Sequence, residues 1–302
     1  MKPLATFLLT IAVFNAQAQV PAEQPPSRVI ALIAAVGDRI EVIRQRQQVG
    51  SNIEPFTRKT LQVPSQALNY AVLRGLDAAV AADDPKATRV LLQWTMPAEL
   101  SARVEKANGQ DRQPLVLEAL LSYLRALPQR KDWDQVELLV PAYIYTPMHG
   151  MGTRLSGIGV YIQPLANQSI GLGDINDKDV AFTETDGDFK TINPNTGETA
   201  KSSVYVAPFM YFERLSYNAG TLELIKRQRF FSNTKYADPQ STALDVGDQM
   251  SPVQIMGKLM ETVERAAYKS IRQNATGEVT VSPIKPLPAA SAAAASPSTP
   301  PP

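Results

Sequence analysis

The sequence predicts an α/β fold, with a mixed α+β arrangement as the alternative, in which a single mixed β-sheet carries helices on its faces. Three observations lead to this prediction. In the first half of the chain, apolar and β-branched runs of strand length alternate with amphipathic stretches of helical period. The second half is rich in alternating segments separated by turn sequences, which is typical of β-hairpins. An amphipathic helix follows these segments. Helical crossovers give parallel strand pairs and hairpins give antiparallel ones, so the sheet is expected to be mixed.

The expected elements of the first half are a hairpin over 28–47, a helix over 65–83, a strand over 88–95, helices over 98–107 and 114–127, and a strand over 136–145. The hairpin is expected because Gly37 and Asp38 separate two runs of strand character, the first apolar on both faces and the second half exposed. Asn108-Gly109 is expected to end the first of the two consecutive helices. Pro141 predicts that the last strand is an edge strand or carries a bulge.

The second half is expected to contain strands within 153–163, 180–192, 199–217 and 221–231. Strong turn sequences lie at 193–198 and 218–220, where Asn, Pro and Gly cluster. The last helix is predicted to begin at Ser251, with Pro252 in its first turn and Gln254 completing a capping box.

The N-terminus has the features of a secretory signal peptide over residues 1–18. Lys2 precedes a short apolar run, and Ala16-Gln17-Ala18 is a small-x-small cleavage site, so cleavage is expected between Ala18 and Gln19. A periplasmic or secreted location follows, with no transmembrane anchor after cleavage because no other apolar run approaches 18 residues.

Beyond the leader, we expect an extended lead-in over 19–27, a single domain over 28–280 and a disordered tail over 281–302. The tail is composed almost entirely of Pro, Ala and Ser, which bury too little apolar surface to offset the entropy of ordering. Two lobes divided near residue 147 are the alternative to a single domain.

Composition excludes several classes of protein. The 302 residues include 30 basic and 29 acidic side chains, one histidine and no cysteine. The lack of cysteine excludes a disulfide framework, a thiol nucleophile, an iron–sulfur cluster and a zinc finger. The balanced charge argues against nucleic-acid binding.

His149 is the single candidate for imidazole acid–base catalysis, and it lies in a glycine-rich segment after a predicted strand. No Gly-x-Ser-x-Gly sequence is present to supply a nucleophile for it. The alternative is an ordinary loop histidine.

Five aspartates cluster within a short stretch and are candidate ligands for Ca²⁺ or Mg²⁺: Asp174, Asp177, Asp179, Asp186 and Asp188. Their spacing departs from that of an EF-hand loop. Aspartate is also a common turn former, which is the alternative interpretation. No other cofactor is predicted.

Lys226, Arg227 and Arg229 form a basic patch that is a candidate site for an anionic surface polymer or for the edge of a partner protein. The alternative is an edge strand protected by charges. On a strand, Arg227 and Arg229 would face one way and Lys226 the other. The aromatic residues at 205, 209, 211 and 212 are expected in the core.

These observations favour a non-catalytic periplasmic or secreted envelope protein that binds a partner protein or a surface polymer. The missing nucleophile elbow, zinc-ligand patterns and phosphate-binding loops are the basis for that preference. A metal-dependent hydrolase that uses the aspartates is the first alternative. A domain that binds a small ligand in an apolar pocket is the second.

Overall fold

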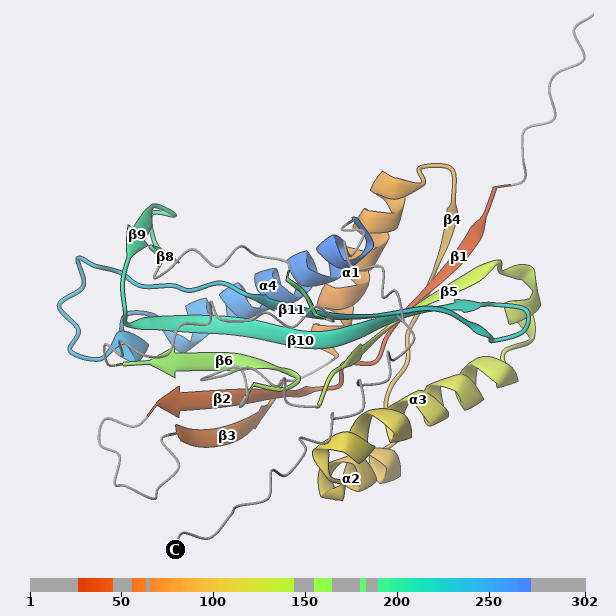
Figure 1. The fold of residues 1–302 in the computed structure, drawn as a ribbon, viewed down its shortest axis with the longest axis horizontal. Coiled ribbons are helices and arrows are strands. Elements are labelled where there is room, and N and C mark those ends of the chain that lie inside the picture. The colour runs from red at the N-terminus through yellow and green to blue at the C-terminus, as the bar shows by residue number, and fades with distance from the viewer. Residues whose placement is uncertain are drawn as a thin grey trace, which may run out of the picture.

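The computed structural model describes residues 27–45, 56–63, 66–143, 155–164, 180–182 and 190–272. These residues build one mixed nine-stranded sheet and four α-helices (Figure 1), which confirms the predicted fold class. The strands of the sheet are β1 (Val29–Ala34), β2 (Arg39–Gln45), β3 (Phe56–Gln62), β4 (Thr88–Leu92), β5 (Gln135–Pro141), β6 (Ile158–Gln163), β7 (Val180–Phe182), β10 (Tyr205–Asn218) and β11 (Leu224–Asn233). The helices are α1 (Ala67–Asp83), α2 (Ala98–Lys106), α3 (Gly109–Ala126) and α4 (Pro252–Arg272). A separate hairpin pairs β8 (Lys190–Ile192) with β9 (Thr199–Lys201), and short 3₁₀ turns lie at Pro128–Asp132 and Val246–Asp248.

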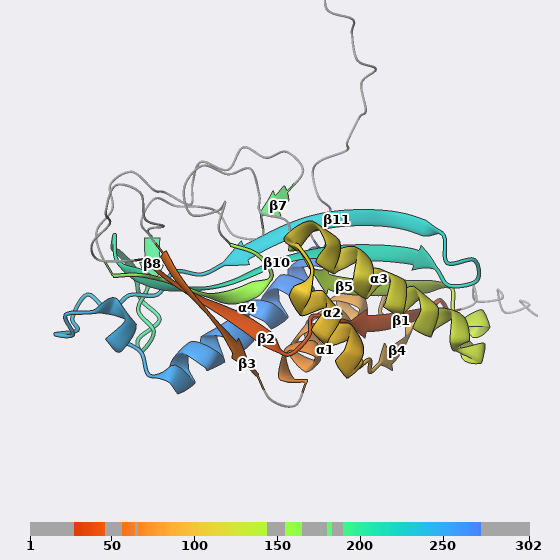
Figure 2. The ribbon, with the colours of Figure 1, turned by 90° about the horizontal axis from the view of Figure 1, so that it is seen from below.

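The sheet has two halves that follow one another along its longest strand, β10. The first part of β10 pairs antiparallel with β6, and its second part pairs antiparallel with β5. Beside β5 lie β1 and then β4, both parallel to it. Beside β6 lie β2, parallel, and then β3, antiparallel. β11 pairs with β10 from Phe209 to Tyr217, mainly along the part that also pairs with β5, and Figure 2 shows these two strands side by side. We call the place where the two halves meet the sheet junction.

Helices cover both faces of the sheet. Along β1, Ile30, Leu32 and Ala34 pack in the same core as α1 and α4, whereas Ala31 and Ile33 pack in the core formed with α2 and α3. This alternation follows from the two-residue period of a strand. We refer to the two sides as the α1/α4 face and the α2/α3 face.

A third cluster lies around β2, β3, β6 and the first part of β10. It contains the aromatic residues Phe56, Tyr161, Tyr205, Phe209, Tyr211 and Phe231. With Phe212 in the core of the α1/α4 face, all four aromatic residues expected in the core of this strand are buried, as predicted.

The predicted hairpin over 28–47 is wrong, because β1 and β2 do not pair. β1 lies between β4 and β5, and β2 lies between β3 and β6. A strand that is apolar on both faces belongs inside a sheet. The two neighbours of β1 are β4 and β5, which the chain reaches through the helical connections α1 and α2/α3. Gly37, with φ of 79°, bends the chain across the sheet junction, and β2 then continues in the same direction as β1.

Two proline residues occupy positions that differ from expectation. Pro141 is the last residue of β5, which is a central strand rather than an edge. Pro114 lies inside α3, which begins at Gly109 instead of at the proline. Proline removes one helical hydrogen bond, but the buried Val116 and Leu120 fix the helix on the sheet.

The strand predicted over 199–217 is divided, because β9 ends at Lys201 in the separate hairpin and β10 begins at Tyr205 in the main sheet. Several other local predictions agree with the structure. The predicted stripe of α1 is buried at Leu68, Val72, Leu76 and Val80. At the start of α4, the Ser251 hydroxyl accepts from the Gln254 amide at 3.2 Å, and the Gln254 side chain accepts from the Ser251 amide at 2.9 Å. The turn at 193–198 joins β8 to β9, and that at 218–220 begins the connection of β10 to β11. No described helix is apolar over a length sufficient to span a membrane.

The crossing of α1 and α4 requires a glycine at position 75. A Cβ atom there would overlap the carbonyl oxygen of Glu264 and lie 2.9 Å from the Cβ atom of Ala267. The two helices therefore approach each other at backbone distance, and both complete the same core.

We predict that Gly75→Ala lowers the free energy of unfolding by about 2 kcal/mol or more, because the helices must separate to accept the methyl group. Gly257→Ala, in an open position of α4, is the matched control. It should raise the free energy of unfolding by about 0.5–1 kcal/mol through helix propensity. Urea unfolding of both variants measures this, and equal effects at the two positions would contradict the close crossing.

Candidate functional site

Six of the site residues predicted from the sequence lie outside the described residues. They are His149, Asp174, Asp177, Asp179, Asp186 and Asp188. Within the described ranges, no three side chains of His, Cys, Asp or Glu converge as metal ligands would. The candidate catalytic histidine and the candidate aspartate metal site therefore remain predictions.

The basic patch lies on β11, and two of its three residues are engaged within the chain. Arg227 Nε lies 2.6 Å from one carboxylate oxygen of Glu213, and Arg229 Nη2 lies 3.0 Å from the other. The Glu213 side chain is only 2% exposed, so the two guanidinium groups compensate a buried carboxylate. Lys226 is exposed and belongs to the opposite face of the strand, as the alternation predicts.

This pairing changes what the patch offers to a partner. An anionic polymer would compete with Glu213 for Arg227 and Arg229, which leaves Lys226 as the basic group without an ion pair among the described residues. Binding of an envelope partner or polymer at Lys226, Arg227 and Arg229 remains a prediction.

A pocket lies at the sheet junction, where the carboxyl ends of the parallel strands β4, β1 and β5 are found. After these ends the chain diverges: β1 continues into β2, whereas β4 leads into α2. Divergent connections at the carboxyl ends of parallel strands leave a crevice, which is the usual place for ligands in α/β sheets.

The pocket is open to one side and has a volume of about 150 Å³. Residues from the ends of β1 and β5, from the start of β6, and from α2 and the first turn of α3 surround it. Its apolar lining includes Val36, Met96, Val104, Pro141 and Ile158. Its charged lining residues are Asp38, Arg39, Glu41, Glu105 and Arg112.

Most of the charges at the pocket are paired. Arg39 Nη1 lies 2.7 Å from Glu105 Oε1, and this hydrogen bond lowers the pKa of Glu105. Glu41 pairs with Arg58 from β3. Burial raises the pKa of Glu41, and the positive charge of Arg58 opposes that shift.

Arg112 and Tyr143 lie together at the pocket. The guanidinium carbon of Arg112 is 5.8 Å from the centre of the Tyr143 ring, a cation–π distance. Burial raises the pKa of Tyr143 to about 12, so its hydroxyl stays protonated at neutral pH. Two glycines admit the tyrosine: a Cβ at Gly109 would lie 3.0 Å from its carbonyl oxygen, and Gly157, with φ of 65°, lies against its ring.

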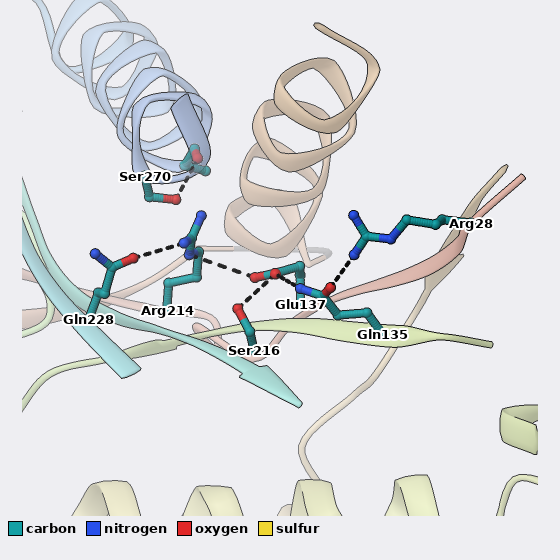
Figure 3. Close-up of polar contacts among 8 residues, drawn as sticks. Arg28, Gln135, Glu137, Arg214, Ser216, Gln228 and Ser270 are labelled. Atoms are coloured by element: carbon teal, nitrogen blue, oxygen red, sulfur yellow. Dashed lines mark hydrogen bonds and ion pairs between the residues drawn. The ribbon is translucent and has the colours of Figure 1, made fainter. Parts of the chain in front are cut away.

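A second polar cluster is buried on the α1/α4 face (Figure 3). Ser216 donates to Glu137 Oε1 at 2.7 Å, and Gln135 donates to the same oxygen. Arg214 donates to Gln228 at 2.8 Å, and its Nε lies 3.6 Å from Glu137 Oε2. Figure 3 shows these side chains on three neighbouring strands, below the end of α4.

The ion pair in this cluster is deeply buried and incompletely bonded. The side chains of Glu137 and Arg214 are each 8% exposed. Arg214 Nε and Glu137 Oε2 make no hydrogen bond, since their separation is too long for one. Burial raises the pKa of Glu137, while Arg214, Ser216 and Gln135 oppose this shift; burial also lowers the pKa of Arg214. The cluster does not line the pocket.

Sequence reasoning missed the pocket residues. In the sequence, Arg112 lies just before the helix predicted over 114–127, and Tyr143 lies in the strand predicted over 136–145. The signal that was present is the position of Tyr143, a polar aromatic residue two places after the proline that ends a buried strand.

The buried pair yields a prediction for a double-mutant cycle. Either Arg214→Leu or Glu137→Leu leaves the remaining charge without its counter-ion, and we expect each to lower the free energy of unfolding by about 3 kcal/mol. The double variant should cost much less than the sum, because it leaves no buried charge unpaired. Urea unfolding at neutral pH measures the cycle. Additive effects of the two replacements would show that the groups do not interact.

A second prediction concerns the charge on β11. Joint replacement Arg227→Glu and Arg229→Glu places two carboxylates against the buried Glu213 and should lower the free energy of unfolding by about 3 kcal/mol or more. Lys226→Gln, at an exposed position of the same strand, should change it by less than about 0.5 kcal/mol. Thermal and urea unfolding of both variants test this, and similar small changes would mean that Glu213 does not depend on the two arginines.

Comparisons with known proteins add a weak structural likeness. No family model matches the chain, and no curated protein matches it in sequence. The fold is similar to the crystal structure of protein XCC0632 from Xanthomonas campestris, which carries the family designation DUF330. That likeness has a TM-score of 0.32 and 9% identity and covers 81% of each chain. Agreement at this level assigns neither a family nor an activity.

Proposed function

We propose that this chain is a non-catalytic binding protein whose pocket at the sheet junction holds one small organic molecule. The single observation that carries the proposal is the pocket itself: a cavity of about 150 Å³ at the carboxyl ends of parallel strands, lined by apolar side chains and a few polar groups. Ligand pockets generally combine an apolar lining with a small number of placed polar groups.

The volume limits the size of the ligand. A cavity of this volume accommodates a molecule of about the size of benzene. We therefore propose a ligand whose bound part has roughly six to ten non-hydrogen atoms.

The lining also supports binding rather than catalysis. The described lining residues include Ser101, Ser156 and Thr60, but no histidine or cysteine lines the described pocket. Glu41, a possible proton acceptor, is held by Arg58. A serine nucleophile needs an adjacent base, and the described lining pairs none of its hydroxyl groups with one.

The other expectations from the sequence, an envelope location and metal-dependent hydrolysis, remain proposals that rest on the sequence alone. The periplasmic or secreted location rests on the leader over 1–18, and metal-dependent hydrolysis rests on the aspartates of 174–188. A ligand-binding role is compatible with an envelope location, so the two proposals are tested separately.

The test is a fragment screen by ligand-observed NMR and thermal unfolding of the full chain. We expect some small organic molecules to bind, and a ligand at 100 times its Kd to add about 2.7 kcal/mol to the free energy of unfolding. Ser101→Phe, on the pocket side of α2, should abolish binding by filling the cavity. Ser122→Phe, on an exposed position of α3 away from the pocket, is the matched control and should leave binding unchanged. The proposal fails if no fragment binds, or if the same fragments bind the Ser101→Phe variant equally well.

A further inference from the structure

We propose that the ligand of the sheet-junction pocket is a small carboxylic acid, bound as its carboxylate by the Arg112 guanidinium and the Tyr143 hydroxyl. This inference rests on the proposed function and specifies the chemical class of the ligand.

The charge balance identifies Arg112 as the available cation. Among the described residues, Arg39 pairs with Glu105 and Arg58 pairs with Glu41. Arg112 lines the same pocket and has no carboxylate within 4 Å in the described ranges, although its charge acts at longer range on Glu41 and Glu105 and favours the ionised form of both carboxyl groups. A partly buried guanidinium that has no paired carboxylate remains available as the partner of an anionic ligand.

The remaining acidic residue does not neutralise Arg112. Asp38 accepts a hydrogen bond from the Gln62 side chain at 3.0 Å. Its charge also acts on Arg39, whose pKa is raised mainly by its hydrogen bond to Glu105 and further by this carboxylate. Asp38 is therefore associated with the Arg39 side of the pocket.

Arg112 is fixed in place by the backbone but keeps free donors. Its Nε donates to the carbonyl oxygen of Ala107 at 3.1 Å, and its Nη2 donates to that of Glu105 at 3.4 Å. Both carbonyls belong to the end of α2, where a cation is favourable. A guanidinium has five N–H donors, so three remain for a ligand. A donor group held in position in advance loses less entropy on binding.

Tyr143 supplies a neutral donor beside this cation. Tyr143 lines the pocket, its ring lies against the Arg112 guanidinium, and no described residue accepts a hydrogen bond from its hydroxyl. Because its pKa is raised to about 12, the hydroxyl donates and does not compete as an anion. A guanidinium together with a neutral O–H donor matches the two oxygens of a carboxylate.

The rest of the lining accommodates a hydrocarbon group. Met96, Val104 and Pro141 line the same cavity of about 150 Å³. An aromatic ring or a branched chain of four or five carbons fills such a volume. Benzoate and isovalerate are therefore suitable probes, with benzamide and isovaleramide as uncharged counterparts of the same shape.

The experiment compares each acid with its amide by NMR titration and calorimetry of the full chain. We expect each acid to bind the wild-type chain at least ten-fold more tightly than its amide, because only the acid forms charge-assisted hydrogen bonds. Arg112→Gln should abolish this preference, Arg112→Lys should retain part of it, and Tyr143→Phe should weaken acid binding about ten-fold. Arg103→Gln, at an exposed position of α2 outside the pocket, is the matched control and should change nothing.

The amides also report on the integrity of the pocket, since their affinity for the Arg112→Gln variant should equal that for the wild-type chain. If acid and amide bind the wild-type chain equally, or if Arg112→Gln keeps the preference for the acid, the carboxylate assignment is overturned and the proposed binding function stands. If only uncharged fragments bind and Ser101→Phe abolishes that binding, the assignment is likewise overturned. If neither the acids nor any fragment binds, both proposals fail together.

Discussion

The continuity of β10 is the constraint on which the rest of the structure depends. Its register places β6 along one part of the strand and β5 along the other, so the two halves of the sheet are joined by one backbone. All its residues except Asn218 are buried, which means that helices or other side chains must cover both of its faces. The α1/α4 pair covers one face, and its close crossing at Gly75 brings both helices onto the same core. The pocket also depends on this arrangement of β10, because β5 ends and β6 begins beside it at the junction and the space between them is left open.

Local patterns predicted the elements well, since their causes are local. The stripe of α1 follows from helical period, and the cap of α4 follows from the chemistry of Ser251 and Gln254. The error at β1 and β2 has a non-local cause. A glycine with positive φ is compatible with a hairpin turn and also with a simple bend of the chain. Here the chain bends, because β4 and β5 occupy both edges of β1 and leave no edge for β2.

The candidate site was harder to predict, because its residues are distant in sequence. Arg112 belongs to the first turn of α3 and Tyr143 follows β5, and they meet only because that helix and that strand pack on each other. The role of Arg112 depends on which arginines of the pocket already form ion pairs with carboxylates, and the sequence does not show these ion pairs. The basic patch illustrates the same limit: Arg227 and Arg229 look available in the sequence, but Glu213, from the neighbouring strand, occupies both.

The adjacent charges at the centre of β10 have a consequence for folding. Glu213 meets Arg227 and Arg229 on one side of the sheet, and Arg214 meets Glu137 on the other. A slip of one residue in the pairing of β10 would exchange the sides, so that each charge would enter an apolar core without its counter-ion. A strand so rich in aromatic and aliphatic residues would otherwise tolerate several alignments. The buried charges of Glu213, Arg214 and Glu137 thus disfavour misaligned sheets, in which they would lose their counter-ions.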